Sequence, residues 1–403
     1  MNQGFLRVGH LPTLIAAFLY FDLSFMAWVI LGPLAVQIGG DLHLDAAQKG
    51  LMVATPVLAG AAFRVVLGLL VDHLGPKRTG ALAQAVVITG LALGWLVGIR
   101  TYAEVLLLGA VLGVAGASFA VALPLASRWY PPQHQGIALG IAGAGNSGTV
   151  LAALFAPSIA AAIGWNDALG LIALPLAAVL VVYLVLAKDS PEQPAARSLS
   201  AYLGVLRHGD AWLFMFLYSV TFGGFVGLAS SLTLYFNEQF HLPAVTAGYF
   251  TAACVFAGSL VRPVGGAVAD RIGGARSLTA MYGVAAAMLA LVSIDLPSGW
   301  IALPVFVVAM LALGMGNGAV FQLVPQRFRR EIGVMTGLVG MAGGVGGFYL
   351  AYSLGLAKQV TGRAGPGFLL FAGLALIALV TLTVAKVRWR RTWDSALAGT
   401  ARI

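Results

Sequence analysis

Long apolar runs separated by short polar segments dominate the pattern along this chain. A helix that crosses a bilayer needs about 20 apolar residues, and twelve runs of that kind can be placed. They cover residues 12–37, 49–71, 79–99, 103–127, 135–162, 167–187, 211–236, 245–269, 277–295, 300–324, 332–357 and 366–387. The pattern predicts an all-α membrane protein with twelve transmembrane helices.

The longest polar segment, Lys188 to Asp210, follows the sixth run and contains the Pro-bearing stretch SPEQPAARS. A segment of that composition is typical of a linker. The sequence therefore predicts an N-terminal six-helix bundle over 1–187, a linker over 188–210, a C-terminal six-helix bundle over 211–387 and a basic tail over 388–403.

Composition excludes a water-soluble protein. The 403 residues are 60% hydrophobic and only 9% charged, whereas soluble domains carry about 25% charged residues. The 52 glycines would weaken soluble helices, but in a membrane bundle they let helix backbones approach closely. The lipid bilayer is therefore the expected solvent for most of the surface.

The net charge of +9 arises from Lys and Arg residues that gather in one set of loops. The opposite loops carry only Lys49, Arg100, Lys358 and Arg363. Cytoplasmic loops are the ones enriched in Lys and Arg, so both termini and the linker are predicted to be cytoplasmic in an inner-membrane protein. The same distribution argues against nucleic acid as a partner.

An internal repeat links the two halves. The second run reads FRVVLGLLVDHLGPKR and the eighth reads VRPVGGAVADRIGGAR. At one common offset, four positions match: Arg64, Gly68, Asp72 and Gly75 with Arg262, Gly266, Asp270 and Gly273. Repeated halves of this kind predict a pseudo-symmetric transporter. The acids and glycines of the repeat are interpreted as gating loops at the cytoplasmic helix ends.

Arg64 and Arg262 are the strongest candidates for a binding site. Arg64 lies eight residues before Asp72, which places it about 12 Å into a hydrocarbon core about 30 Å thick. Arg262 reaches the same depth in the other half, so pseudo-symmetry predicts that the guanidinium groups face each other. An intramembrane Arg costs about 2.5–3.5 kcal/mol on insertion scales, and a bound anion would offset that cost. The alternative is pairing with an acid, but Asp22 is the only clear mid-span acid and serves at most one Arg.

Two Gly-rich segments, GIALGIAGAGNSG and GVMTGLVGMAGGVGG, fall at related positions of the fifth and eleventh runs. They predict either close helix packing or bare backbone lining a substrate path. Asn146 in GNSG favours the path, because an amide donates hydrogen bonds to an oxyanion. The glycines assigned to the path are Gly140, Gly143, Gly145, Gly148, Gly340, Gly343, Gly344, Gly346 and Gly347.

The motifs ALGIAGAGNSGT and GLVGMAGGVGGF, each downstream of a mid-span Arg, resemble those of the nitrate/nitrite porter family of the major facilitator superfamily. GNGAVFQLVPQRF and YSVTFGGF also look like this family, and the resemblance covers nearly the whole chain. It implies the major facilitator fold, with Arg64 and Arg262 clamping the anion. It further implies that Asn146, Tyr218, Phe222 and Phe119 complete the pocket; by themselves, the three aromatics indicate only helix packing. Some members carry an Asn beside the aromatic of the fourth run, where this chain reads GASFAV.

Transport coupling is the next expectation. Anion entry opposes an inside-negative potential at about 2.3 kcal/mol per charge per 100 mV, so uptake needs proton symport or anion exchange. Asp22 is the candidate proton carrier, because an intramembrane carboxylate is a functional candidate by default. Its position resembles the family's proton-linked nitrate uptake branch.

The resulting prediction is a monomeric nitrate/proton symporter that also accepts nitrite. A nitrate/nitrite antiporter, a carrier of another small anion such as an organophosphate or carboxylate, and a transport-inactive anion sensor remain alternatives. No catalytic residues, metal ligands or cofactor motifs are recognised, which argues against an enzyme.

Overall fold

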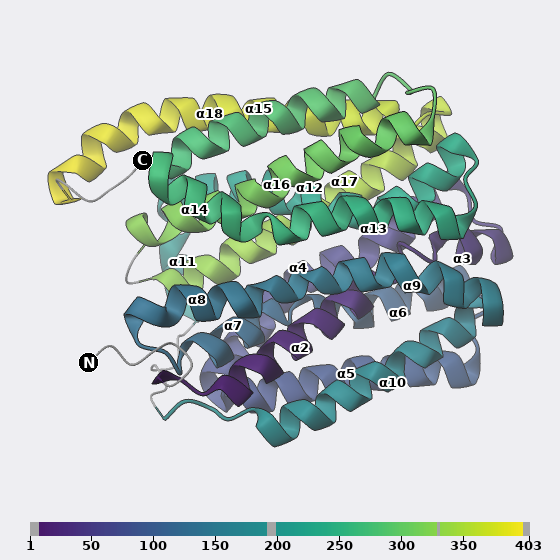
Figure 1. Cartoon of the computed structure of the whole chain (residues 1–403), viewed down its shortest axis with the longest axis horizontal. Coiled ribbons are helices and arrows are strands. Elements are labelled where there is room, and N and C mark those ends of the chain that lie inside the picture. The colour runs from purple at the N-terminus through teal and green to yellow at the C-terminus, as the bar shows by residue number, and fades with distance from the viewer. Residues whose placement is uncertain (1–7, 192–198, 329–330, 398–403) are drawn as a thin grey trace.

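The computed structural model describes residues 8–191, 199–328 and 331–397, and every regular element in these ranges is a helix (Figure 1). The N-terminal half contains α2 (Leu11–Trp28), α3 (Ala35–Asp41), α4 (Ala46–Leu74), α5 (Pro76–Val97), α6 (Tyr102–Gly116), α7 (Phe119–Ser127), α8 (Pro132–Gly143), the 3₁₀ helix η1 (Ala144–Ser147), α9 (Gly148–Ile163) and α10 (Trp165–Leu186). The C-terminal half contains α12 (Gly209–Phe240), α13 (Ala244–Leu260), α14 (Arg262–Ile272), α15 (Gly274–Val292), α16 (Gly299–Arg327), α17 (Ile332–Thr361) and α18 (Gly365–Leu397). The short helix α11 (Leu199–Val205) lies in the linker between them.

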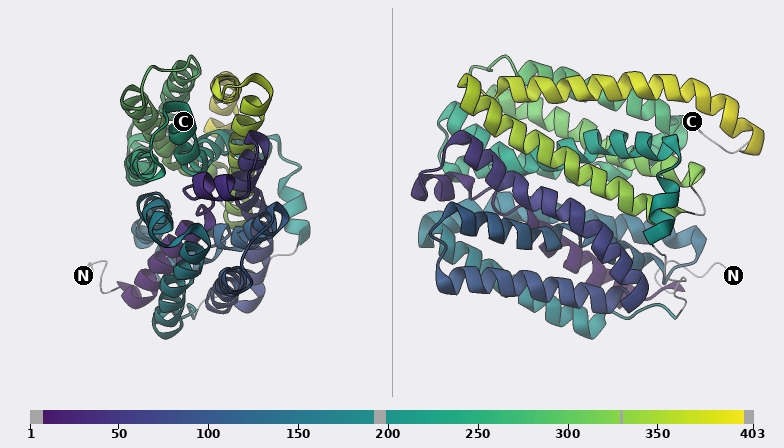
Figure 2. Two further views of the ribbon diagram at one scale, coloured as in Figure 1. Left: turned by 90° about the vertical axis from the view of Figure 1, so that its right-hand side faces the viewer. Right: turned by 180° about the vertical axis from the view of Figure 1, so that it is seen from behind.

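Twelve helical stretches in the described ranges are long and apolar enough to cross a membrane. The all-α class and the number of spans predicted from the hydrophobic pattern are therefore confirmed. The purple-to-teal helices of the N-terminal half lie together, below the green-to-yellow helices of the C-terminal half in Figure 1, and Figure 2 shows the same two groups from other sides. We call the end of the bundle where α2 begins and α18 ends the terminal end, and the other end the opposite end.

Four of the predicted runs are interrupted, which the hydrophobic pattern did not predict. The first run turns after Trp28, the fourth breaks between Gly116 and Phe119, the fifth passes through η1, and the eighth breaks at Val261. Proline at the second position of α14 explains the last break, because Pro263 has no amide hydrogen to continue the preceding helix. In η1 the sequence GAGNS supplies the glycines that permit a tighter turn. Each break falls beside a residue of the candidate site described below.

The repeated motif glycines Gly75 and Gly273 have a clear backbone role. They adopt φ angles of 82° and 98°, in the region that residues with a Cβ rarely occupy. Each ends one long helix and allows the next to begin immediately, α5 after Gly75 and α15 after Gly273. The two halves therefore turn between successive spans with the same device.

The terminal end of the C-terminal half is tied together by Asp210, a buried residue near the start of α12. Its carboxylate accepts hydrogen bonds from Arg327 Nε at 2.7 Å and Trp389 Nε1 at 2.9 Å, and it also contacts Arg388. These contacts tie α18 to α12 and α16, and α18 continues as one helix to Leu397. The helix therefore continues through residues 388–397, beyond the predicted end of the last span at 387, while 398–403 lie outside the described residues.

Glycines let the two halves touch along α4 and α17. A Cβ built on Gly344 would lie 2.7 Å from the Cβ of Ala61, and one on Gly50 would lie 2.8 Å from the Cα of Gly355. Real Cβ atoms do not approach so closely. Backbone-to-backbone packing of small residues therefore forms this interface.

We expect Gly344→Ala to push α17 away from α4, because the added methyl group overlaps Ala61. Overpacking a tight contact costs about 1–3 kcal/mol, so the melting temperature of the purified protein should fall. Gly373→Ala is the matched control, since a Cβ there meets nothing within 4 Å. Equal melting temperatures for Gly344→Ala and wild type would contradict the packing role.

Candidate functional site

Arg64 is the first residue of the candidate site. It lies in the middle of α4 with only 2% of its surface exposed. Its Nε donates to the backbone carbonyl of Gly116 at 3.2 Å, and its Nη1 donates to the carbonyl of Gly340 in the other half. The guanidinium is therefore held by backbone carbonyl groups from both halves.

Arg262 approaches from the C-terminal half at the helix break that begins α14. Its Nη2 donates to the Tyr218 hydroxyl at 3.4 Å. Its guanidinium carbon lies 5.8 Å from the Phe119 ring centre, and so does that of Arg64. The structure thus brings both arginines to one aromatic ring, whereas the repeat predicted only that the two guanidinium groups face each other.

Aromatic rings enclose this arginine pair. Phe222 lies 4.9 Å from the Arg64 guanidinium and stacks on Tyr218 at 5.2 Å with an interplanar angle of 5°. Rings at such distances attract the cations through their π faces. Tyr218, Phe222 and Phe119 therefore lie around the arginine pair, although the sequence alone favoured only helix packing for them.

Two further aromatics were missed from the sequence. The Trp28 ring lies 5.3 Å from the Arg64 guanidinium, with its Nε1 donating to the Pro56 carbonyl at 2.7 Å. The Phe321 ring lies 5.6 Å from the Arg262 guanidinium. Trp28 is the last residue of α2 before a turn, and Phe321 stands in GNGAVFQLVPQRF. Neither position carries a pattern that separates a site aromatic from a core aromatic.

The site retains hydrogen-bonding capacity that no protein group uses. Arg64 Nη2 and Arg262 Nη1 are buried and have no partner among the described residues. The amide of Asn146 is also buried, and neither of its polar atoms has a partner there. Buried polar groups are normally hydrogen-bonded, so these three side chains have the capacity to bind a polar ligand.

Asn146 lies on η1, which packs against α2. A Cβ on its neighbour Gly145 would lie 2.7 Å from the Phe21 ring, and Phe21 lies 5.9 Å from the Phe119 ring. The helix that carries Asn146 therefore packs on α2 beside Phe21, which contacts the Phe119 ring shared by the two arginines.

Asp22 does not serve as the partner of Arg64. Its carboxylate accepts a hydrogen bond from Ser147 Oγ at 2.7 Å and another from the backbone amide of Gly148. No ion pair joins Asp22 to a described Lys or Arg side chain, nor does one join Arg64 or Arg262 to a described acid. The alternative in which an acid neutralises the arginines is therefore wrong for the described residues.

The signature glycines divide into two groups. Gly340 provides the carbonyl that binds Arg64, and a Cβ on Gly343 would lie 2.8 Å from the Tyr218 and Phe222 rings. The others in close contact pack helices: Gly145 and Gly148 against α2, Gly344 against α4, Gly346 against α12, and Gly347 against both α4 and α12. Gly140 and Gly143 face open space.

The repeated loops, for which the sequence predicts a gating role, lie at the terminal end. Asp72, near the end of α4, pairs with Arg128 at 3.2 Å, and both belong to the N-terminal half. Asp270 occupies the corresponding exposed position near the end of α14. Gly68 and Gly266 precede these acids by one turn.

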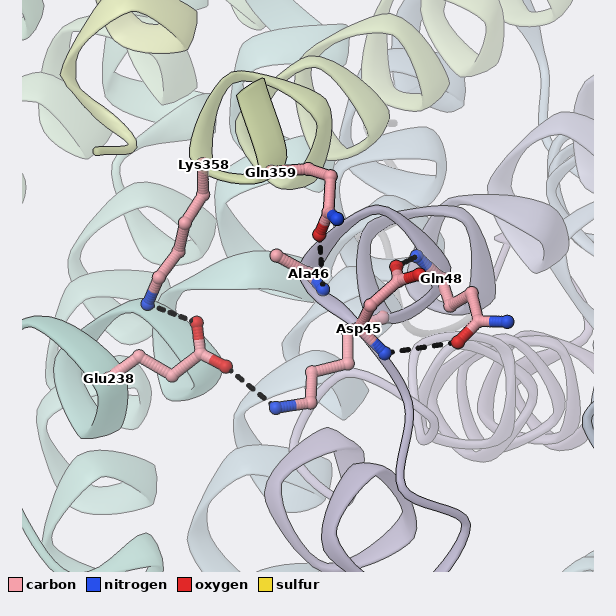
Figure 3. A network of polar contacts seen from close by, with 7 residues as sticks. Asp45, Ala46, Gln48, Glu238, Lys358 and Gln359 are labelled. Atoms are coloured by element: carbon pink, nitrogen blue, oxygen red, sulfur yellow. Dashed lines mark hydrogen bonds and ion pairs between the residues drawn. The ribbon is translucent and has the colours of Figure 1, made fainter. Parts of the chain in front are cut away.

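An ion network joins the two halves at the opposite end (Figure 3). Glu238 on α12 binds Lys49 on α4 at 2.9 Å and Lys358 on α17 at 2.6 Å. Nearby, the backbone amide of Ala46 donates to Gln359 Oε1 at 3.1 Å. This network, together with the Gly50–Gly355 contact, joins the two halves at the opposite end.

Comparisons with known proteins agree with this architecture. The family described as Major Facilitator Superfamily matches residues 16–351. The human organic anion transporter MFSD10 has a similar structure, with a TM-score of 0.67 and 17% identity, over 93% of this chain and 99% of that one. The fold is therefore that of major facilitator carriers.

Sequence relatives narrow the class. The probable nitrate/nitrite transporter NarK2 of Mycobacterium tuberculosis is 34% identical over 92% of this chain and 95% of its own length. The probable nitrate/nitrite antiporter NarK1 of Thermus thermophilus is 32% identical over 94% of this chain and 93% of its own. The chain belongs to the nitrate/nitrite porter family of the major facilitator superfamily. It is a multi-pass membrane transporter and not an enzyme.

Proposed function

We propose that this chain carries nitrate, and also nitrite, across the inner membrane by alternating access, with proton symport as the driving reaction. The observation that carries the proposal is the pair of buried guanidinium N–H groups, Arg64 Nη2 and Arg262 Nη1, without protein partners. One comes from each half, so an anion between them links the halves. The names of the relatives support nitrate and nitrite as the anions.

The chemistry of the pocket supports a small planar oxyanion over a larger anion. Each guanidinium is planar and presents paired donors that match two oxygens of a planar anion. The Tyr218 and Phe222 rings and Phe119 occupy the space around the arginines. An organophosphate would need further polar partners, whereas the surroundings of the described arginines are mainly aromatic and backbone groups.

Proton symport is favoured over exchange by the surroundings of Asp22. This intramembrane carboxylate is hydrogen-bonded by a hydroxyl and a backbone amide rather than paired with a cation. Such a group can gain and lose a proton without breaking an ion pair. Anion exchange needs no titratable group, so an exchanger would have no use for it.

We assign the terminal end to the cytoplasm, because Lys and Arg are concentrated in its loops. In that orientation, the Glu238 network closes the periplasmic end and the substrate exchanges with the cytoplasm. Transport then requires Lys49 to part from Glu238, while Lys358 can stay with it because both belong to the C-terminal half.

Counterflow in proteoliposomes tests the proposal. Purified protein is reconstituted and loaded with nitrate, nitrite, phosphate or formate, with and without an imposed pH gradient. We expect external labelled nitrate to accumulate in vesicles that were loaded with nitrate or nitrite. We also expect a pH gradient that is acid outside to drive net nitrate uptake. Counterflow only with phosphate or formate would reject the proposed substrate, and nitrate counterflow that ignores the gradient would favour the antiporter.

Removing the charge of Glu238 should favour opening of the periplasmic end. In Glu238→Gln the contact between the halves loses an ion pair worth about 1 kcal/mol, which corresponds to about a fivefold change in the conformational equilibrium. The reporter is a cysteine introduced by Val53→Cys, one helical turn after Lys49, in a protein whose Cys254 is replaced by Ala. We expect a membrane-impermeant maleimide to label this cysteine faster in cells when Glu238→Gln is also present.

Glu104→Gln is the control for this experiment, because Glu104 lies at the same end and bonds only within its own half, to Thr101 and Arg100. It should leave the labelling rate of Val53→Cys unchanged. Equal rates in the Glu238→Gln and wild-type backgrounds would argue that the network does not hold the periplasmic end closed.

A further inference from the structure

Asn317, on α16, is a buried amide that the arrangement described so far does not explain. Only 1% of its surface is exposed, and neither Nδ2 nor Oδ1 has a hydrogen-bond partner among the described residues. Leaving such a group unsatisfied is costly, and buried amides are normally hydrogen-bonded. The other side-chain amides in the described part of α16, those of Gln322 and Gln326, are less deeply buried.

The helix register places Asn317 on the face directed at the arginine pair. Phe321 lies one turn later on the same face. Its ring contacts Tyr218 at 5.1 Å, Phe119 at 6.1 Å and the Arg262 guanidinium at 5.6 Å. Asn317 therefore faces the same central region, one helical turn nearer the opposite end.

Neighbours on either side of Asn317 fix its depth. A Cβ on Gly318 would lie 2.6 Å from the backbone nitrogen of Gly266, against the first turn of α14 that carries Arg262. A Cβ on Gly316 would lie 2.6 Å from the Thr221 side chain on α12. Asn317 thus lies between α12 and α14, at the level of Arg262 and of the Tyr218–Phe222 pair.

The internal repeat gives a second, independent observation. Leu112, Gly113 and Pro124 on the fourth span match Leu313, Gly314 and Pro325 on the tenth at one common offset, and this offset pairs Gly116 with Asn317. The Gly116 carbonyl accepts a hydrogen bond from Arg64. In this register Asn317 matches the residue whose backbone carbonyl accepts a hydrogen bond from the arginine of the other half.

We propose that Asn317 is a ligand of the transported anion, with its Nδ2–H group donating to an anion oxygen held at Arg262. This inference rests on the proposed function and adds to it a polar contact from the C-terminal half. Asn317 would be the counterpart, in the C-terminal half, of Asn146, which is the buried amide of the N-terminal half. The unpartnered Nη1 of Arg262 lies on the guanidinium that faces the same region, so both groups become satisfied when the anion is present.

The test uses Asn317→Leu, which keeps the approximate side-chain size but removes both polar atoms. Loss of one hydrogen bond to a charged ligand weakens binding by about tenfold to hundredfold, which isothermal titration of the purified protein with nitrate measures. Without nitrate, the melting temperature should stay equal or rise, because the variant removes an unsatisfied buried amide. A purely structural asparagine would give the opposite sign, a lower melting temperature.

Controls separate this inference from the proposed function. Ser277→Ala, on α15, removes a different kind of buried polar group, a hydroxyl that has no partner among the described residues. This variant should bind nitrate like wild type. If the Leu variant is not recovered, Asn317→Ala carries the same measurement. The inference is overturned if the Asn317 variant binds nitrate with wild-type affinity. It is also overturned if, in the absence of nitrate, the variant melts at a lower temperature than wild type. A wild-type protein that binds neither nitrate nor nitrite overturns the proposed function and the inference with it.

Discussion

Arg64→Lys and Arg262→Lys are each expected to lose most nitrate binding. Lysine keeps the positive charge but presents a compact ammonium, so it cannot reproduce a planar fork that binds protein groups and an anion at once. Arg64 bonds the carbonyls of Gly116 and Gly340 and still has Nη2 available. Each substitution should weaken nitrate binding by about 10–100-fold, measured by isothermal titration, and the double variant should show no binding.

Arg363→Lys is the matched control. Arg363 pairs with Asp295 and is half exposed. It lies between α17 and α18 at the opposite end of the bundle, away from the aromatic rings around the arginine pair. The same conservative change there should leave nitrate affinity unchanged. Melting temperatures without nitrate identify any variant whose fold is damaged. Wild-type affinity in a well-folded Arg64→Lys or Arg262→Lys protein would remove that arginine from the site.

Asp22→Asn is expected to abolish nitrate uptake driven by a pH gradient and to preserve nitrate/nitrite exchange. The asparagine has the same shape, and its Oδ1 can still accept the hydrogen bonds from Ser147 and Gly148. What the variant loses is the ability to bind and release a proton. Net uptake and exchange are measured separately in proteoliposomes, with and without the gradient.

Asp41→Asn provides the comparison for Asp22→Asn. Asp41 also accepts a hydrogen bond, from the Trp165 indole at 2.6 Å, but it lies at the opposite end of the bundle. The Asp41→Asn protein should retain nitrate uptake driven by the pH gradient. An Asp22→Asn protein whose uptake responds to the gradient like wild type would exclude Asp22 as the proton carrier, and loss of exchange as well as uptake would indicate a structural role.

The main features predicted from the sequence are those that depend on short stretches of chain. Twelve spans follow from run length, because a bilayer demands about 20 apolar residues for each crossing. The correspondence of Arg64 and Arg262 follows from a repeat within two segments, and counting residues from the helix ends gave their depth. For Gly75 and Gly273 the sequence predicts gating loops, and only the structure shows that they turn the chain between successive helices.

Only the tertiary structure decided which residues meet. Trp28 and Phe321 join the arginine pair, Asp22 bonds to Ser147 rather than Arg64, and Glu238 connects Lys49 with Lys358. Each of these contacts joins segments far apart in the chain. An aromatic, acidic or glycine residue in an apolar run has the same sequence signature whether it faces lipid, a neighbouring helix or a binding site. The packing of twelve helices and the breaks within them select among these faces, and no periodicity within a single run contains that information.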